Sequence, residues 1–181
     1  MTEDGFDVGA WERRLQDHRR AKDEFFETDP DSPLAESART DFGGLSYFRL
    51  DPDLRIEARY EPLQAPEEVR LGATRGPDLE YERVGTTGFE RAGDHHVLRV
   101  YRAPGVEDLL VPFRDETNGR ESWQHGRYLS LSVEDPASAG EIVLDFNLAY
   151  HPFCVYDETY VSAIPPTENE LPFGVRAGER L

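Results

Sequence analysis

The spacing of hydrophobic residues changes along the chain, from about four near its start to two further on. Between Val8 and Glu27 apolar residues recur with helical spacing, and Asp7 stands where an N-cap accepts hydrogen bonds from the first backbone N–H groups. These apolar residues are Trp11, Leu15 and Phe25 or Phe26. The pattern predicts one amphipathic helix.

A second helix signal follows at Ser32-Pro33-Leu34. Serine can cap a helix, and proline is accepted at the first helical position because its missing N–H would have no partner there. The sequence therefore predicts a short helix with Ser32 as its cap, ended by Gly43-Gly44.

From Leu54 to Glu61 apolar and charged residues alternate, which is typical of a strand with one buried and one solvated face. More short strands are expected, with turn residues about every 8–12 positions. Their ranges are 68–71, 79–84, 88–91, 97–102, 108–113, 128–133 and 142–146. Gly93-Asp94 is expected to form a hairpin loop between two of them.

These patterns predict a mainly β fold, either a β-sandwich or a partly open β-barrel, with one N-terminal amphipathic helix and a short second helix. We expect a single domain over residues 1–181. It would consist of a helical N-terminal segment (1–44), a β core (45–162) and an extended C-terminal tail (163–181).

Prolines are the reason to expect an extended tail. Pro165-Pro166 and Pro172 cannot donate to a β ladder. We expect this tail to wrap around the domain, with Phe173 and Val175 as anchors.

Charge adds the strongest compositional signal. The 181 residues include 37 acidic and 20 basic side chains, and Lys22 is the only lysine. The net charge of −17 raises self-repulsion in dilute buffer, and molar salt screens it. Excess carboxylates with almost no lysine resemble proteins of salt-loving archaea. We therefore expect a halophilic protein that loses stability when salt is removed.

The same composition argues against several partners. Nucleic acid is not expected, because phosphate binding depends on clustered basic residues, and the run from Arg13 to Lys22 is interleaved with acidic ones. No apolar run approaches the roughly 20 residues of a membrane span. The acidic start from Met1 to Asp7 does not resemble a secretion signal, and a single cysteine forms no intrachain disulfide. A cytoplasmic location is therefore expected.

The first candidate site is the polar loop from Asp115 to Tyr128, which lies between two apolar strands. Arg127 could bind a carboxylate or phosphate group, His125 could transfer protons near neutral pH, and Tyr128 could orient a substrate. Asp115 is also an ordinary turn former, so a structural role for the loop is the alternative.

The second candidate site is the range Leu144 to Tyr156, which holds the only cysteine. Asp145 is the candidate general base, and the candidates for positioning or binding a ligand are Asn147 and Tyr150. His151 and Cys154 together with Asp145 give an alternative, a mononuclear metal site. The structural interpretation is that the cysteine is a small buried hydrophobe and that Asp145 and Asn147 fix the turn after a strand.

Short motifs occur in a fixed order along the chain. They are Ser32-Pro33-Leu34, Phe42-x-Gly44-Leu45-x-Tyr47-Phe48, Pro112-Phe113-x-Asp115-x-Thr117-x-Gly119-x-Glu121, Gly126-Arg127-Tyr128-Leu129, Leu144-Asp145-Phe146-Asn147-x-Ala149-Tyr150-x-Pro152-x-Cys154, Pro165-Pro166-x-x-Asn169-x-Leu171 and Ala177-Gly178-Glu179. From about Trp11 to the C-terminus the chain thereby resembles the family called domain of unknown function 1684 (DUF1684).

The resemblance implies no activity, because that family is uncharacterised. It does change which single residues are the stronger candidates for a functional site. The family pattern resembles this chain at Asp115, Arg127, Tyr128, Asp145, Asn147, Tyr150 and Cys154. The positions of His125 and His151 commonly carry Gly and Asn in the family, which argues against shared catalytic histidines. Ala163 stands where members tend to have a second cysteine.

Three functions follow as hypotheses, and the sequence identifies no cofactor. The first is a small-ligand site, binding or hydrolytic, where the 115–128 loop meets the 144–156 segment; Arg127 there favours an anionic or sugar-like ligand. The second is a non-catalytic binding or structural module that engages a protein partner or another copy of the chain as a homo-oligomer. The third is the metal site at His151, Cys154 and Asp145. Whether the protein is an enzyme stays open.

Overall fold

The computed structural model describes residues 5–181, which fall into two compact units with their boundary between Ser46 and Tyr47. We call them unit 1 and unit 2. The single domain expected over residues 1–181 stays a prediction. The acidic start that argued against a secretion signal includes residues 1–4, which lie outside the described residues.

Unit 1 contains the predicted amphipathic helix, α1 (Val8–Thr28). The Asp7 carboxylate caps it by accepting a hydrogen bond of 2.9 Å from the Ala10 N–H. Of the apolar residues at helical spacing, Trp11, Leu15 and Phe26 are buried. Hydrophobic spacing and cap chemistry thus located this element correctly.

The short second helix exists, but it begins later than predicted. It is α2 (Glu36–Arg39), and its N-cap position is held by Ala35 without a side-chain hydrogen bond. The Ser32 hydroxyl instead donates to the Phe26 carbonyl at 2.6 Å and accepts from the Leu34 N–H at 3.1 Å. Ser32 therefore closes the end of α1 and does not start α2.

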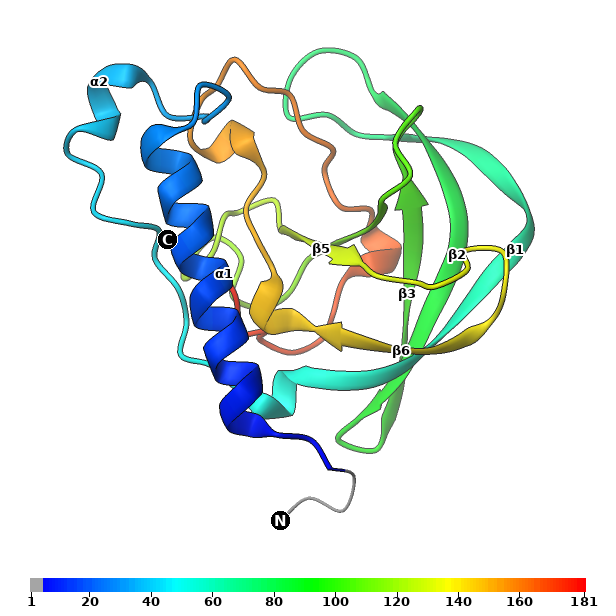
Figure 1. The fold of residues 1–181 in the computed structure, drawn as a ribbon. Helices are drawn as coiled ribbons and strands as arrows, with labels where there is room; N and C mark the ends of the chain where they lie inside the picture. The colour runs from blue at the N-terminus through cyan, green and yellow to red at the C-terminus, as the bar shows by residue number, and fades with distance from the viewer. Residues whose placement is uncertain (1–4) are drawn as a thin grey trace. The chain divides into compact units, whose positions relative to one another are not determined.

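Unit 2 is mainly β, as predicted. Its six strands form one antiparallel sheet in the order β5-β4-β3-β2-β1-β6, and the sheet curls into a half-barrel (Figure 1). The strands are β1 (Arg55–Leu71), β2 (Leu79–Arg91), β3 (Asp94–Arg102), β4 (Leu109–Phe113), β5 (Arg127–Leu131) and β6 (Gly140–Asp145). Short 3-10 helices follow at Pro52–Leu54, Phe146–Leu148, Phe153–Val155 and Thr167–Asn169.

Two strands are longer than the sequence indicated. β1 continues through Pro62, and its pairing with β2 shifts register between Pro62 and Glu67. β2 similarly runs through Gly85 to Gly88. The hairpin after it turns at Ala92 and Gly93, both with positive φ (53° and 87°), one residue earlier than predicted.

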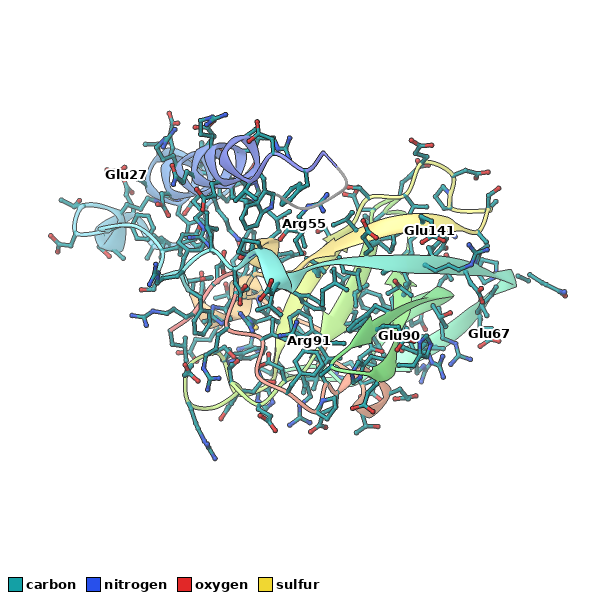
Figure 2. The ribbon with its side chains drawn as sticks, turned by 90° about the horizontal axis from the view of Figure 1, so that it is seen from below. Glu27, Arg55, Glu67, Glu90, Arg91 and Glu141 are labelled. Atoms are coloured by element: carbon teal, nitrogen blue, oxygen red, sulfur yellow. The ribbon has the colours of Figure 1, made fainter. Side chains whose placement is uncertain are left out.

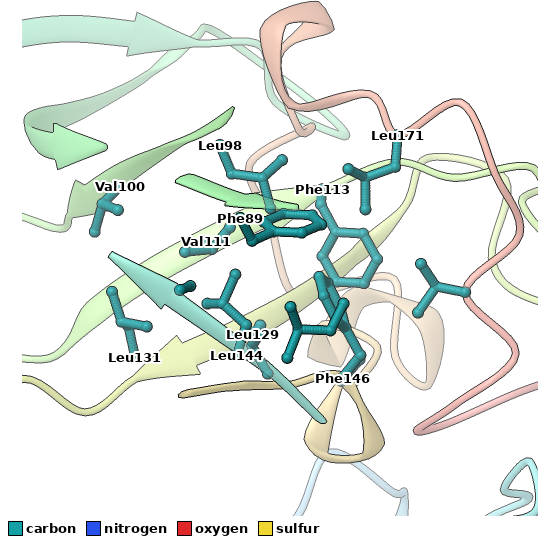
Figure 3. Close-up of a cluster of buried hydrophobic side chains, with 14 of the residues drawn as sticks. Phe89, Leu98, Val100, Val111, Phe113, Leu129, Leu131, Leu144, Phe146 and Leu171 are labelled. Carbon is teal, nitrogen blue, oxygen red and sulfur yellow. The ribbon is translucent and has the colours of Figure 1, made fainter. Parts of the chain in front are cut away.

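The core of unit 2 lies on the concave side of this sheet, where alternate residues of the strands meet. Phe89, Leu98, Val111, Phe113 and Phe146 gather in one buried cluster (Figure 3). Phe113 and Phe146 meet edge to face with their ring centroids 5.3 Å apart.

One glycine of β2 is required by this packing. A Cβ atom at Gly85 would lie 2.7 Å from the Tyr60 ring and 2.7 Å from the Glu61 carbonyl oxygen. Tyr60 is fully buried, and its hydroxyl donates to the Pro136 carbonyl. The absence of a side chain at Gly85 thus lets this tyrosine lie flat against the neighbouring strand.

Charged side chains occupy the outside of the sheet. Glu67, Glu90 and Glu141 project away from the ribbon in Figure 2, and half or more of each side chain is exposed.

Within residues 5–181, no helix has the length and apolar character needed to cross a membrane.

Candidate functional site

The two candidate segments lie side by side in unit 2, as the leading hypothesis required. Tyr128 of β5 and Tyr150 exchange two backbone hydrogen bonds, each 2.9 Å long. The Trp123 N–H also donates to Nε2 of His151 at 3.2 Å. Residues 115–128 and 144–156 therefore meet along their backbones, and the direction of each side chain decides what they can do together.

Arg127 points into the core of unit 2. Its guanidinium donates to the carbonyl oxygens of Val175, Ala177 and Glu179 and, at 3.0 Å, to Oδ2 of Asp115. The side chain has no exposed surface. Burial lowers the pKa of Arg127, and the Asp115 carboxylate opposes that shift.

The surroundings of the guanidinium complete this enclosure. The centres of the Phe48 and Phe113 rings lie 5.6 and 5.5 Å from the guanidinium carbon, within the distance of a cation–π interaction. We call this arrangement the Arg127 clamp. One side chain holds the C-terminal segment by binding three backbone carbonyls at alternate residues.

Asp115 is bound just as fully. Its Oδ1 accepts hydrogen bonds from the N–H groups of Thr117 (2.8 Å) and Val175 (3.1 Å), while Oδ2 faces Arg127. The bond to Thr117 is the local Asp turn expected of a turn former. The bond to Val175 joins this turn to the C-terminal segment.

Tyr128 lies on the opposite face of β5 from Arg127, because consecutive residues of a strand point in opposite directions. Its hydroxyl donates to the Ala163 carbonyl, and its ring meets Tyr150 edge to face at 5.8 Å. Burial raises the pKa of Tyr128 well above its usual value, so the phenol stays protonated at neutral pH. Arg127 and Tyr128 therefore do not share one cavity.

Tyr150 is more accessible than Tyr128. Its side chain is partly exposed, and its hydroxyl lies 3.4 Å from that of Ser130. Burial raises the pKa of Tyr150 as well. Its neutral phenol thus lies beside the Ser130 hydroxyl at the surface of unit 2.

Asp145 and Asn147 form a turn at the end of β6. Oδ1 of Asp145 accepts from the backbone N–H of Asn147 at 3.1 Å and from its side-chain amide at 2.9 Å. The Asn147 amide also bonds the backbone N–H and C=O of Asp51, each at 2.8 Å. This pair fixes the 3-10 turn that follows β6 and ties it to the chain before β1, which is the structural role considered for these residues.

His151 belongs to a buried polar cluster. Since its Nε2 accepts from Trp123, its Nδ1 carries the proton, and Nδ1 lies 3.7 Å from Oε2 of Glu179. The same carboxylate oxygen accepts from the His151 N–H at 2.7 Å and from the Tyr156 hydroxyl at 3.1 Å.

The metal hypothesis needed His151, Cys154 and Asp145 to converge. In the part of the chain that the structure describes, no three His, Cys, Asp or Glu side chains lie close enough to hold a metal ion. Cys154 is partly exposed and free of disulfide bonds. The structure thus does not bring the three proposed ligands together.

Two important residues escaped the sequence reasoning. Glu179 is almost fully buried in the cluster around His151. Asn169 is fully buried and bonds the backbone N–H of Arg99 (2.7 Å), the carbonyl of Arg99 (2.9 Å) and the carbonyl of Pro112 (2.7 Å). Both stand in the motifs near the C-terminus, and membership of those motifs was the available signal, because charged neighbours such as Glu168 and Glu170 hide the burial of Asn169 in the local pattern.

The site residues described above line neither of two surface hollows. One, of about 510 Å³, is at the far end of the β1–β2 hairpin, and the other, of about 390 Å³, lies beside the connection from β5 to β6. The first is lined by Glu68, Val69, Arg70, Glu80, Tyr81, Glu82, Pro104 and Gly105.

Comparisons with known proteins agree with this fold. The family model described as protein of unknown function (DUF1684) matches residues 40–180. The solution NMR structure of an uncharacterized protein of Haloarcula marismortui is similar to this chain, with 42% sequence identity and a TM-score of 0.76. The similarity covers 97% of this chain and 96% of that one. None of the curated proteins matches the chain.

Proposed function

The chain belongs to the DUF1684 family of proteins of unknown function, and from its own geometry we propose that it is a non-catalytic binding module. In this proposal the polar residues shared with the family hold the C-terminal segment of unit 2 in place. The ligand or partner then binds on the surface that this arrangement supports.

The observation that carries the proposal is the use of the Arg127 guanidinium. It donates to three backbone carbonyls and to Asp115, and it is shielded from solvent. A guanidinium that binds a carboxylate or phosphate ligand needs an open face with free donors. Arg127 offers its two terminal nitrogens to the chain itself, and its Nε is buried, which supports a structural role.

Other shared residues follow the same rule. Asp115 binds the Val175 N–H, Asn147 binds both backbone groups of Asp51, and Asn169 binds the backbone of β3 and the Pro112 carbonyl. Buried polar groups that satisfy backbone donors and acceptors specify one arrangement of loops. This common use supports a scaffold more than a reaction centre.

Substitution of Arg127→Gln tests the structural role. We expect a loss of about 3–5 kcal/mol of unfolding free energy, because the change leaves Asp115 as an unpaired buried charge. Hydrogen exchange followed by mass spectrometry should show faster exchange in peptides from residues 171–181. Arg176→Gln is the matched control, since Arg176 lies in the same segment but pairs with Glu121 at the surface. Unchanged exchange in Arg127→Gln would remove the proposed role.

The absence of catalysis needs a separate experiment. The protein, in molar KCl, should not hydrolyse generic ester, phosphate monoester and glycoside substrates above background. Asp145→Asn is the informative variant, because Asp145 is the candidate general base. Hydrolysis by the wild-type protein that Asp145→Asn abolishes, with folding intact, would establish an enzyme and end the proposal.

A small-ligand site at the meeting point of the two candidate segments is the second candidate function. It is favoured by the backbone pairing of Tyr128 with Tyr150 and by the partly exposed Trp123, His125 and Tyr150 beside it. Aromatic rings with a neutral phenol donor suit a sugar-like or other polar ligand. NMR titration with a set of sugars should then shift the Trp123 indole N–H signal saturably, and Tyr150→Phe should weaken binding. A second copy of the chain is a further candidate partner, and light scattering would measure it.

A further inference from the structure

Arg99 and Arg114 start from neighbouring strands on the same face of the sheet. Arg99 lies on β3 between Leu98 and Val100, and Arg114 directly follows Phe113 at the end of β4. Leu98, Val100 and Phe113 all point into the buried cluster of unit 2 (Figure 3). Because side chains alternate along a strand, both arginines point to the opposite, outer face.

Asn169 holds the two arginines together. It bonds the backbone N–H and C=O of Arg99 through its side chain, and its own carbonyl accepts from the Arg114 N–H at 2.9 Å. Asn169 itself is fully buried. The side chains of Arg99 and Arg114 therefore start from backbone positions that Asn169 fixes.

Each of these arginines has an unused donor. The Nε atom of Arg99 and the Nε atom of Arg114 are both shielded from solvent, and neither has a hydrogen-bond partner. A buried N–H without an acceptor costs free energy that an arriving acceptor would recover. Arg83 and Arg127 also have a buried Nε without a partner, but their other guanidinium nitrogens bond to the carboxylates of Glu67 and Asp115.

The surrounding charges define what could bind. Glu168 and Glu170 flank Asn169 in the chain and are exposed, so they oppose an anion without closing the site. Arg83 is a third cation nearby, since Arg83, Arg99 and Glu168 all act electrostatically on Tyr101. Arg83 itself pairs with Glu67.

We propose that Arg99 and Arg114 form an oxyanion-binding site on the outer face of β3 and β4, which takes the phosphate group of a small ligand. Arginine donors in a planar fork match the oxygen atoms of a phosphate, and two such groups can share one anion. The inference rests on the proposed function, because it names the ligand class of the binding module. The site does not include Arg127 or Asp115, the ion pair that binds residues 175–179.

NMR of the arginine side chains gives a direct test. Inorganic phosphate is titrated into the labelled protein in molar KCl at constant ionic strength, and the Nε–H signals of Arg99 and Arg114 are followed. Arg99→Gln and Arg114→Gln identify these signals, each by the loss of one peak. We expect both signals to shift and saturate, and each substitution to weaken phosphate binding about tenfold or more, the worth of a hydrogen bond to a charged group.

Two further variants complete the test. Arg49→Gln removes an exposed arginine elsewhere in unit 2 and should leave phosphate binding unchanged, whereas Glu168→Gln should tighten it. If a substitution prevents folding, the test is whether two arginine Nε–H signals of the wild-type protein shift and saturate with phosphate. Equal, unsaturable shifts of all arginines would overturn the site. The hydrogen-exchange result for Arg127→Gln would still stand in that case, so failure of the site and failure of the proposed function can be told apart.

Discussion

Asp115 and Arg127 form an ion pair of 3.0 Å in which neither side chain has any exposed surface. A buried pair of this kind stabilises a protein only when its remaining donors and acceptors are also bonded, because removing two charges from water is costly. Here the carboxylate accepts two backbone N–H groups, and the guanidinium donates to three carbonyls, with only its Nε left without a partner. The pair thus joins the loop after β4, the start of β5 and the C-terminal segment.

Asp115→Asn tests the energetic weight of this pair. The amide keeps the shape of the side chain but leaves the Arg127 charge buried without compensation, so we expect a loss of about 3–5 kcal/mol in unfolding free energy. Urea denaturation in molar KCl would measure it. Glu141→Gln, in an exposed pair with Arg59, is the control and should change little. Equal stability of Asp115→Asn and the wild-type protein would contradict this account.

Alkaline pH should destabilise unit 2 through Tyr128. Burial raises the pKa of its phenol above the ordinary value, so the unfolded chain releases this proton first as the pH rises. The contribution of the neutral phenol is therefore complete below about pH 10, the unfolded pKa, and is lost as the pH climbs from there toward the folded pKa.

The variant Tyr128→Phe separates this effect from the hydrogen bond. At neutral pH we expect it to be less stable by about 1 kcal/mol, because the bond to the Ala163 carbonyl is lost. Above about pH 10 its stability should fall less steeply than that of the wild-type protein. Unfolding free energies from urea titrations at several pH values would show this, and parallel profiles for the two proteins would refute it.

The acidic surface predicts a dependence on salt. With 37 acidic and 20 basic residues, repulsion among exposed carboxylates should weaken as the Debye length falls from about 10 Å at 0.1 M salt to about 3 Å at 1 M. We expect the urea midpoint to rise between these concentrations of KCl. A midpoint that does not respond to salt would show that the charges are balanced locally by pairs such as Arg59–Glu141.

The fold was largely predictable because burial imposes periodicity on a sequence. The alternation from Leu54 to Glu61 located the first half of β1, and the apolar spacing after Asp7 located α1. The full length of β1 was not predictable, since Pro62 and Pro66 remove backbone donors that a strand normally uses. The chain tolerates them through the register shift between Pro62 and Glu67, a feature of the pairing with β2 that no local pattern reveals.

The candidate site was predictable only in part, for a reason that β5 makes clear. The sequence drew attention to both Arg127 and Tyr128, but neighbours in a strand point to opposite faces. Arg127 has the same parity as Leu129 and Leu131, both in the core, and that relation was visible in the sequence. The partners of Arg127 could not be read from the sequence, because they are backbone atoms near the C-terminus that only the tertiary fold brings next to it.

The clamp at Arg127 also has a consequence for how this family can vary. A guanidinium that recognises main-chain oxygens at positions 175, 177 and 179 is indifferent to much of the side-chain chemistry there, but it is sensitive to spacing. Inserting or deleting one residue between positions 175 and 179 would turn an oxygen away from the arginine. Evolution should therefore preserve the length of this stretch even where the side chain can change, as at the exposed Arg176.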